Sequence, residues 1–361
     1  MWPDARILDL FSIKLPIIQA PMAGSSGAEL AIAVCEAGGL GSLPCAMLSA
    51  DQIRTEMDII RQNTRGPVNL NFFCHIPAAD TEREAAWRRR LAPYYHELDL
   101  DPDAAPTGSG RTPFDEAACQ IVEEFRPEVV SFHFGLPEEP LLGRVKSSGA
   151  TVLASATTVE EARWLEAHGC DAIIAQGAEA GGHRGVFLGS DIECQPGTFA
   201  LVPQVVDAVS VPVIAAGGIA DGRGIAAAFA LGATAVQIGT AYLRCPESLA
   251  GEGYRLALST ARDDQTALTN IFTGRPARGI MNRFMREVGP MNAEAPVFPT
   301  ATAAMMPLRQ KAEAAGSTGF SPLWAGQAAA LARPLPAGAL TRELAEEALQ
   351  VLDRIRVSTL P

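Results

Sequence analysis

The chain has 361 residues, of which 48% are hydrophobic, and a formal net charge of −12. A chain of this size and apolar content can bury a large core, as one α/β barrel with an appendage or as two domains. The acidic balance disfavours polyanionic partners, because phosphate binding needs clustered Lys and Arg. We therefore expect no nucleic-acid partner.

The seven cysteines are scattered and form no Cys-x-x-Cys pair, which favours a reduced, cytoplasmic setting. The first residues do not have the basic, apolar and small-residue pattern of an export signal. The uncharged stretch from Ile225 to Leu243 is long enough to raise the question of a membrane span. Gly232, Gln237 and Gly239 interrupt it, so we expect a helix followed by a strand, and no membrane partner.

Short runs rich in Val, Ile and Leu alternate with helical patterns along the chain, as expected for parallel strands that are buried on both faces. The predicted strands are Ile17–Ala20, Leu40–Leu43, Val68–Phe72, Val129–His133, Thr151–Ser155, Ala172–Gln176, Val213–Ala216 and Ala235–Ile238. The predicted helices are Ala28–Ala37, Ala50–Gln62, Phe114–Glu124, Val159–Ala167, Leu201–Ala208 and Gly222–Leu231. Eight repeats favour a closed α/β barrel, the (β/α)8 TIM barrel, over an open doubly wound sheet of five or six strands.

The alternation lapses in two places. Residues 77–112 contain the charged run 87–90 and a Pro/Gly-rich segment, which predicts a helix followed by a mobile loop and a candidate lid over the third strand. After Arg244 the strand pattern stops, and Leu340–Ile355 is the clearest amphipathic helix. We therefore expect a catalytic barrel over residues 1–243 and a mainly helical C-terminal subdomain over residues 244–361.

In a barrel of this kind, the residues that end the strands line the active face. Small residues and a proline in Gln19–Gly24 allow close approach of a flat ligand, with Met22 as a polarizable surface, although an ordinary tight turn explains them equally well. Asn71 ends the third strand and offers an amide to a heterocycle edge, or is a plain loop amide. His133 ends the fourth strand and is a secondary candidate for the substrate pocket, the alternative being a hydrogen-bonded core histidine.

The loop after the sixth strand is the most informative segment. It reads Gln-Gly-Ala-Glu-Ala-Gly-Gly-His-Arg-Gly from Gln176 to Gly185. Gly181 and Gly182 permit unusual backbone angles and close ligand contact, and Gln176 is placed to bond the same ligand. Because histidine changes protonation near neutral pH, His183 is the predicted catalytic residue.

The last two strands are followed by glycines, in Gly217–Gly224 and Gln237–Thr240. Glycine loops that lead into helix N-termini expose backbone N–H groups, and barrels often bind phosphate after strands seven and eight. A phosphorylated cofactor is therefore predicted. The chain has no Walker, His-Glu-x-x-His or strand-linked Gly-x-Gly-x-x-Gly motif, and its five dispersed histidines argue against a structural metal.

These segments resemble the nitronate monooxygenase family, formerly called 2-nitropropane dioxygenases, in its bacterial class I form. The similarity runs from about Leu15 to Tyr242 and is most specific in 19–24, 176–185 and 217–240. Residues 321–327 also resemble the tail of the family. The resemblance implies FMN at the barrel mouth, contacted by Pro21, Met22, Ala23, Asn71, Gln176, Gly181, Gly218, Gln237, Ile238, Gly239 and Thr240.

In the family, Gly218 and 237–240 would lie near the phosphate, and Asn71 and Gln176 would face the ring edge. The implied reaction is oxidation of an alkyl nitronate, such as propionate 3-nitronate, by flavin and O₂ to a carbonyl compound and nitrite or nitrate. His183 would orient the anionic nitronate and, if a neutral nitroalkane is accepted, remove its α-proton. The expected partners are a small-molecule nitronate and O₂.

Two alternatives remain open. A flavin-dependent enoyl-acyl carrier protein reductase resembles this barrel and also has a Gly-Gly-His loop, but it would dock an acidic carrier protein, which the acidic balance disfavours despite the run Arg88–Arg90. A non-catalytic FMN-binding barrel would bind flavin without turnover. The preferred nitronate and the oligomeric state are not predicted.

Overall fold

In the computed structural model, which describes residues 1–77, 80–104, 111–189 and 191–357, eight parallel strands form a barrel. The strands are β1 (Ile17–Gln19), β2 (Gly41–Pro44), β3 (Val68–Phe73), β4 (Val129–His133), β5 (Thr151–Ala156), β6 (Ala172–Gln176), β8 (Val213–Ala216) and β9 (Ala235–Ile238). They pair in the order β1-β9-β8-β6-β5-β4-β3-β2, and a parallel bridge between Ile18 and Leu40 brings the two ends of this sheet together. The predicted TIM barrel is confirmed.

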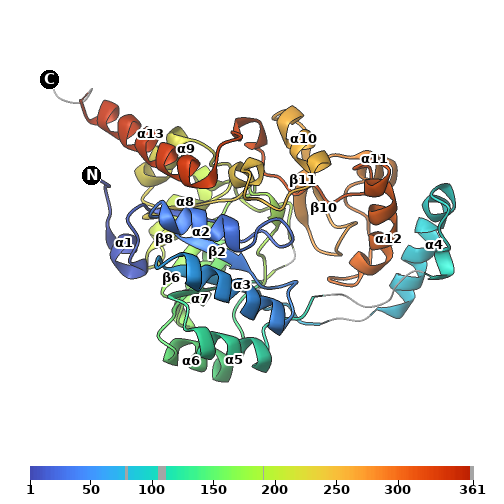
Figure 1. Cartoon of the computed structure of the whole chain (residues 1–361), viewed down its shortest axis with the longest axis horizontal. Helices are drawn as coiled ribbons and strands as arrows, with labels where there is room; N and C mark the ends of the chain where they lie inside the picture. Colours follow the sequence, from blue (N-terminus) through green and yellow to red (C-terminus); the bar gives the residue numbers. More distant parts are fainter. Residues whose placement is uncertain (78–79, 105–110, 190, 358–361) are drawn as a thin grey trace.

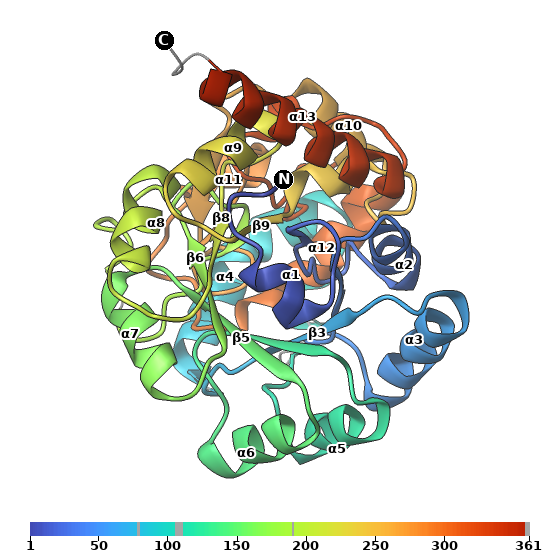
Figure 2. The same ribbon diagram turned by 90° about the vertical axis from the view of Figure 1, so that its left-hand side faces the viewer.

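The barrel interior is closed at its N-terminal end by α1 (Arg6–Phe11). Ile7 and Phe11 are buried against apolar side chains of several strands, Ile18 and Val129 among them. Figure 2 shows α1 across this end of the barrel. The opposite, C-terminal end is therefore the one that remains available for a ligand site.

Helices surround the barrel and are α2 (Ala28–Glu36), α3 (Ala50–Asn63), α5 (Glu116–Phe125), α6 (Glu139–Ser147), α7 (Val159–Ala167), α8 (Thr198–Val206), α9 (Gly222–Ala230) and α13 (Ala337–Val357). Side-chain caps begin several of them. Ser49 and Gln52 form a capping box at α3, and Asp221 accepts hydrogen bonds from the N–H groups of residues 223 and 224 at α9. The C-terminal helix α13 packs against α9 and α2, where its Leu340 and Leu344 join the main core.

A second unit lies at the C-terminal end of the barrel (Figure 1). It contains α4 (Thr81–Glu97), η1 (Pro102–Ala104), α10 (Glu252–Thr260), β10 (Thr266–Thr269), β11 (Ala277–Ile280), α11 (Arg283–Val288), α12 (Ala301–Ala314) and η3 (Ala329–Leu331). The chain enters it through η2 (Thr240–Arg244), whose Ala241 and Tyr242 are still part of the barrel core. Its own core joins Trp87 and Leu91 of α4 to Phe272, Phe284 and Leu308. The short strand β7 (Gly182–His183) pairs with β11 and links this unit to the barrel.

This arrangement corrects the expected organisation in two respects. The region after residue 244 is not free of strands, because β10, β11 and β7 form an antiparallel sheet. Its strands have two to four residues, too few to show an alternating pattern. The second unit also does not coincide with residues 244–361, since α4 joins it from an earlier part of the chain and α13 returns to the barrel.

The helix expected within residues 77–112 is present as α4, but it is not a free lid. Trp87 and Tyr95 are buried, and the Tyr95 hydroxyl donates to the carbonyl of Ala304 over 2.7 Å. Most of the expected loop, residues 105–110, lies outside the described residues. In the described part of the chain, no helix is long and apolar enough to cross a membrane.

A candidate active site at the barrel mouth

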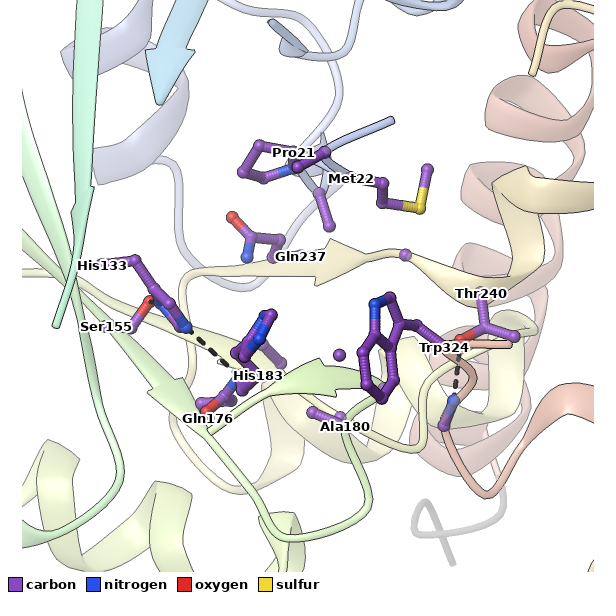
Figure 3. A pocket seen from close by; sticks show the side chains of 18 of the residues that line it. Pro21, Met22, His133, Ser155, Gln176, Ala180, His183, Gln237, Thr240 and Trp324 are labelled. Carbon is purple, nitrogen blue, oxygen red and sulfur yellow. Dashed lines mark hydrogen bonds between the residues drawn. The ribbon is translucent and has the colours of Figure 1, made fainter. Parts of the chain in front are cut away.

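A cavity opens where the barrel strands end and the second unit covers them (Figure 3). It holds about 1300 Å³ of space, part of it open to solvent, which is room for a cofactor and a small substrate together. The predicted site residues that line it are Pro21, Met22, Ala23, Asn71, His133, Gln176, Gly181, His183, Gly218, Gln237, Gly239 and Thr240. Ile238 is not among the lining residues, because its side chain points into the core around the barrel while Gln237 faces the cavity.

The glycine loop after β8 has the backbone that its composition predicts. Gly217 and Gly218 have φ angles of 116° and 70°, a region that favours glycine. The N-terminus of α9, which follows this loop, is not available to a phosphate. Asp221 accepts hydrogen bonds from its first N–H groups, and Glu347 accepts one from the N–H of Gly222. The loops at 217–218 and 239–240, rather than that helix, are therefore the candidate phosphate site.

Gln237 provides evidence that the cavity is built for a bound group. Its side chain lines the cavity, and its Oε1 is buried with no hydrogen-bond partner among the described residues. A buried carbonyl oxygen without a donor costs about 1–3 kcal/mol. A ligand N–H at this position would remove that cost.

Two side chains lock the loop that carries His183. Gln176 donates from Nε2 to the His183 carbonyl over 2.9 Å and accepts at Oε1 from the Gly185 N–H over 2.8 Å. The buried guanidinium of Arg184 donates to the carbonyls of Gly177 and Gln176 over 2.6 and 2.8 Å and to Gln195 Oε1 over 2.7 Å. The amide of Gln176 is thus engaged in holding the loop, and its expected contact with a ring edge stays a prediction.

The paired glycines serve packing as well as ligand access. A Cβ on Gly181 would lie 2.5 Å from the backbone nitrogen of Gly326, and Gly182 has a φ of 73°. Antiparallel pairing of His183 with Ala277 then fixes the loop against the second unit. The catalytic candidate therefore lies between the barrel and this unit.

The imidazole of His183 is enclosed and neutral. Its Nε2 lies 3.0 Å from Thr273 Oγ1, which leaves Nδ1 without a hydrogen-bond partner among the described residues. Phe298 and Trp324 pack around it, with ring centroids 5.4 and 5.5 Å from the imidazole. Burial holds the pKa of His183 well below its usual range, and the charge of Arg111 adds to this effect.

His133 behaves as a structural histidine at the wall of the cavity. Its Nδ1 lies 3.0 Å from Ser155 Oγ and its Nε2 lies 3.2 Å from the His183 carbonyl. Burial lowers the pKa of His133 to about 3, so the ring is neutral and Nε2–H donates to that carbonyl. Both nitrogens are engaged, which favours the core-histidine interpretation over direct substrate binding.

Asn71 also lines the cavity and donates from Nδ2 to Ser131 Oγ over 2.9 Å. Several lining residues escaped the sequence interpretation, namely Arg111, Ser131, Ser155, Tyr254 and Trp324. Residues 321–327 were noted as similar to the family's tail, but no local pattern marked Arg111 or Thr273 as site residues. In the described part of the chain, no group of three or more His, Cys, Asp or Glu could hold a metal ion.

Comparisons with known proteins agree with this geometry. The model of the nitronate monooxygenase family matches residues 4–347. The nitronate monooxygenase of Paraburkholderia phytofirmans is 46% identical over 97% of this chain and 96% of its own, and that of Pseudomonas aeruginosa is 46% identical over 95% and 98%. A solved nitroalkane oxidase from Streptomyces ansochromogenes superposes with a TM-score of 0.88 at 40% identity, covering 97% and 99% of the two chains. FabK from Thermotoga maritima superposes with a TM-score of 0.76 at 30% identity, covering 98% of each.

The fold and the site define a TIM-barrel oxidoreductase with a neutral, enclosed histidine at the barrel mouth. The chain belongs to the nitronate monooxygenase family, and its activity is the oxidation of nitronates.

Proposed function

We propose that this protein is an FMN-dependent nitronate monooxygenase of the cytoplasm that oxidises alkyl nitronates, with propionate 3-nitronate as its substrate and detoxification as its role. The products are a carbonyl compound and nitrite or nitrate. The observation that carries the proposal is the neutral imidazole of His183, whose Nδ1 lies free at a cavity large enough for a flavin and a small anion. When bound, FMN accepts electrons from the nitronate and passes them to O₂.

The residues present fit a flavin mononucleotide. The resemblance implies Gln237 near the phosphate, but its orphan Oε1 needs a hydrogen-bond donor, which a ring N–H would supply and a phosphate would not, so we assign Gln237 to the ring. Met22 would contact the ring face. The backbone N–H groups of the loops at 217–218 and 239–240 would bind the phosphate. Thr240 Oγ1 accepts from the Gly326 N–H over 2.9 Å, so the segment 321–327 supports this part of the site.

His183 would act on the nitronate through Nδ1. When the Thr273 hydroxyl donates to Nε2, the ring carries its proton on Nδ1 and can donate it in a hydrogen bond to a nitronate oxygen. When the imidazole instead donates from Nε2, its Nδ1 lone pair can accept the α-proton of a neutral nitroalkane. The lowered pKa makes His183 a weak base, so the first role is favoured and the nitronate is the better substrate.

Anaerobic stopped-flow absorbance tests the proposal. The purified protein, loaded with FMN, is mixed with propionate 3-nitronate or with NADH or NADPH while the flavin bands are recorded. We expect fast bleaching with the nitronate and none with the nicotinamides. A flavin-free protein that binds no added FMN would overturn the cofactor assignment.

The same experiment decides between the other candidates. Bleaching only by a nicotinamide would move the assignment to an enoyl-acyl carrier protein reductase. Flavin binding with no reduction by any of these compounds would favour a non-catalytic binding barrel.

A further inference from the structure

Arg111 brings a positive charge into the cavity from a segment that sequence interpretation treated only as a loop. Its guanidinium donates from Nη1 to Thr302 Oγ1 over 2.7 Å, and its Cζ lies 5.6 Å from the ring centroid of Phe298. His183 is another neighbour of that ring, at 5.4 Å between centroids. Arg111 and the catalytic histidine therefore share one aromatic side chain.

A positive charge lines the cavity although the chain is acidic. The residues described as lining it include no Asp or Glu, and Arg111 is the one among them with a permanent charge. Burial lowers the pKa of Arg111 to about 10, so the guanidinium remains charged at neutral pH. Because a buried charge interacts strongly in a low dielectric, this part of the cavity favours an anion.

The second nearby cation has a different role. Arg275 stacks on Phe134, with its Cζ 3.9 Å from the ring centroid, and donates to the Val186 carbonyl. It is not among the lining residues of the cavity. Arg111 is therefore the cation in position to contact a substrate.

We propose that Arg111 is a specificity-determining residue that binds a carboxylate on the substrate, so that the site selects short nitronates with a carboxylate at the far end of the chain. This inference rests on the proposed function. The nitronate group would lie at His183 Nδ1 and the carboxylate at the guanidinium. Nη1 of Arg111 already donates to Thr302 Oγ1 and Nη2 lies 3.9 Å from Met47 Sδ, so the second N–H of each nitrogen would donate to the carboxylate. The two ring distances place Arg111 Cζ and the imidazole centroid at most about 11 Å apart. A three-carbon dianion with a hydrogen bond of about 2.8 Å at each end can span a separation up to about that limit.

The test compares two substrates in three FMN-loaded variants. Propionate 3-nitronate carries the carboxylate, and butyl-1-nitronate has an uncharged ethyl group in its place. The variants are Arg111→Met, Arg111→Lys and Arg309→Met. Arg111→Met removes the charge, and Arg111→Lys keeps the charge but lacks the planar pair of N–H donors of a guanidinium. Arg309 is half-exposed on α12, pairs with Glu313 and lies outside the cavity, so its substitution controls for the loss of a positive charge nearby.

The measured quantity is the ratio of kcat/KM for propionate 3-nitronate to that for butyl-1-nitronate, from O₂ consumption. We expect Arg111→Met to lower this ratio about 10- to 100-fold, mainly through KM, as loss of a hydrogen bond to a charged group does. Arg111→Lys should recover part of it, and Arg309→Met should leave it unchanged. Bound flavin per protein reports whether each variant is folded.

Equal losses on both substrates in Arg111→Met and Arg111→Lys, or no loss in either variant, would overturn the assignment of Arg111 while leaving the proposed function intact. Failure of the unsubstituted protein to oxidise either nitronate would overturn the proposed function itself. If Arg111→Met lost its flavin, the ratio of kcat/KM values in Arg111→Lys would still test the proposal. An unchanged ratio in Arg111→Lys would then show that the guanidinium is not needed to select the carboxylate, which would overturn the proposal.

Discussion

Replacement of His183 tests the role of one nitrogen atom. The side chain is held through Nε2 by Thr273, so a ligand can meet only Nδ1. A hydrogen bond from Nδ1 to the nitronate anion in an enclosed site is worth about 1.5–3 kcal/mol. His183→Ala should therefore lower kcat/KM for a nitronate about 10- to 150-fold. For a neutral nitroalkane, which also needs a base, the loss should be larger by a further factor of about 10²–10⁴.

His183→Asn separates these two contributions. The Asn amide nitrogen occupies nearly the position of Nδ1 and donates a hydrogen bond, but it has no basic lone pair. We expect Asn to recover most of the nitronate activity and none of the nitroalkane activity. The assay is O₂ consumption with each substrate at matched flavin content, with His96→Asn on the exposed face of α4 as the control. Full nitronate activity in His183→Ala, or an Asn variant as inactive as Ala, would refute the assignment of Nδ1.

Three further outcomes follow from the same contacts. Because the pKa of His183 lies well below its usual range, kcat/KM for a nitronate should stay level from about pH 8 to 6.5. Arg111→Met removes a nearby positive charge, so the pH at which kcat/KM begins to fall on the acidic side should move upward. A fall in kcat/KM near pH 6.5 in the unsubstituted protein would contradict this reasoning. Arg184→Met leaves buried carbonyls without donors and should lower the free energy of unfolding by about 4 kcal/mol, or Tm by about 5 °C at a fixed flavin concentration. Arg184→Lys should recover part of this loss. An unchanged Tm would show that Arg184 is not needed to hold the loop. Gln237→Leu should raise the Kd for FMN about tenfold by fluorescence titration of the apoprotein, whereas an unchanged Kd would remove Gln237 from the flavin contacts.

The barrel was predictable because its strands are buried on both faces. Each predicted strand lies within one residue of the observed one at either end, and Val129–His133, Ala172–Gln176, Val213–Ala216 and Ala235–Ile238 agree at both. Hydrophobic runs of this kind follow from burial alone and need no knowledge of partners. The strands β10 (Thr-Ala-Leu-Thr) and β11 (Ala-Arg-Gly-Ile) have no such run, because polar residues and a glycine interrupt their apolar residues.

The site was predictable where backbone conformation dictated the residue type. Gly181 and Gly218 stand out in the sequence because a side chain would clash with the backbone of Gly326 at the first position and is disfavoured by a φ of 70° at the second. The sequence around Arg111 and Thr273 gives no comparable indication of a function, since arginines and threonines are common in loops. Their function depends on how the second unit packs over the barrel, which a local pattern does not encode.

These contacts give the barrel and the second unit different roles in the site. The barrel supplies the glycine loops and Gln237, which favour a flat phosphorylated ligand whatever the substrate. The second unit supplies Thr273, which hydrogen-bonds the His183 ring, and Phe298, which neighbours both that ring and Arg111. Changes in the barrel loops should therefore affect cofactor binding first, whereas changes around Phe298 should alter which nitronate is oxidised while the flavin stays bound. Substrate choice in this fold is then decided by residues distant in sequence from the motifs that identify the family.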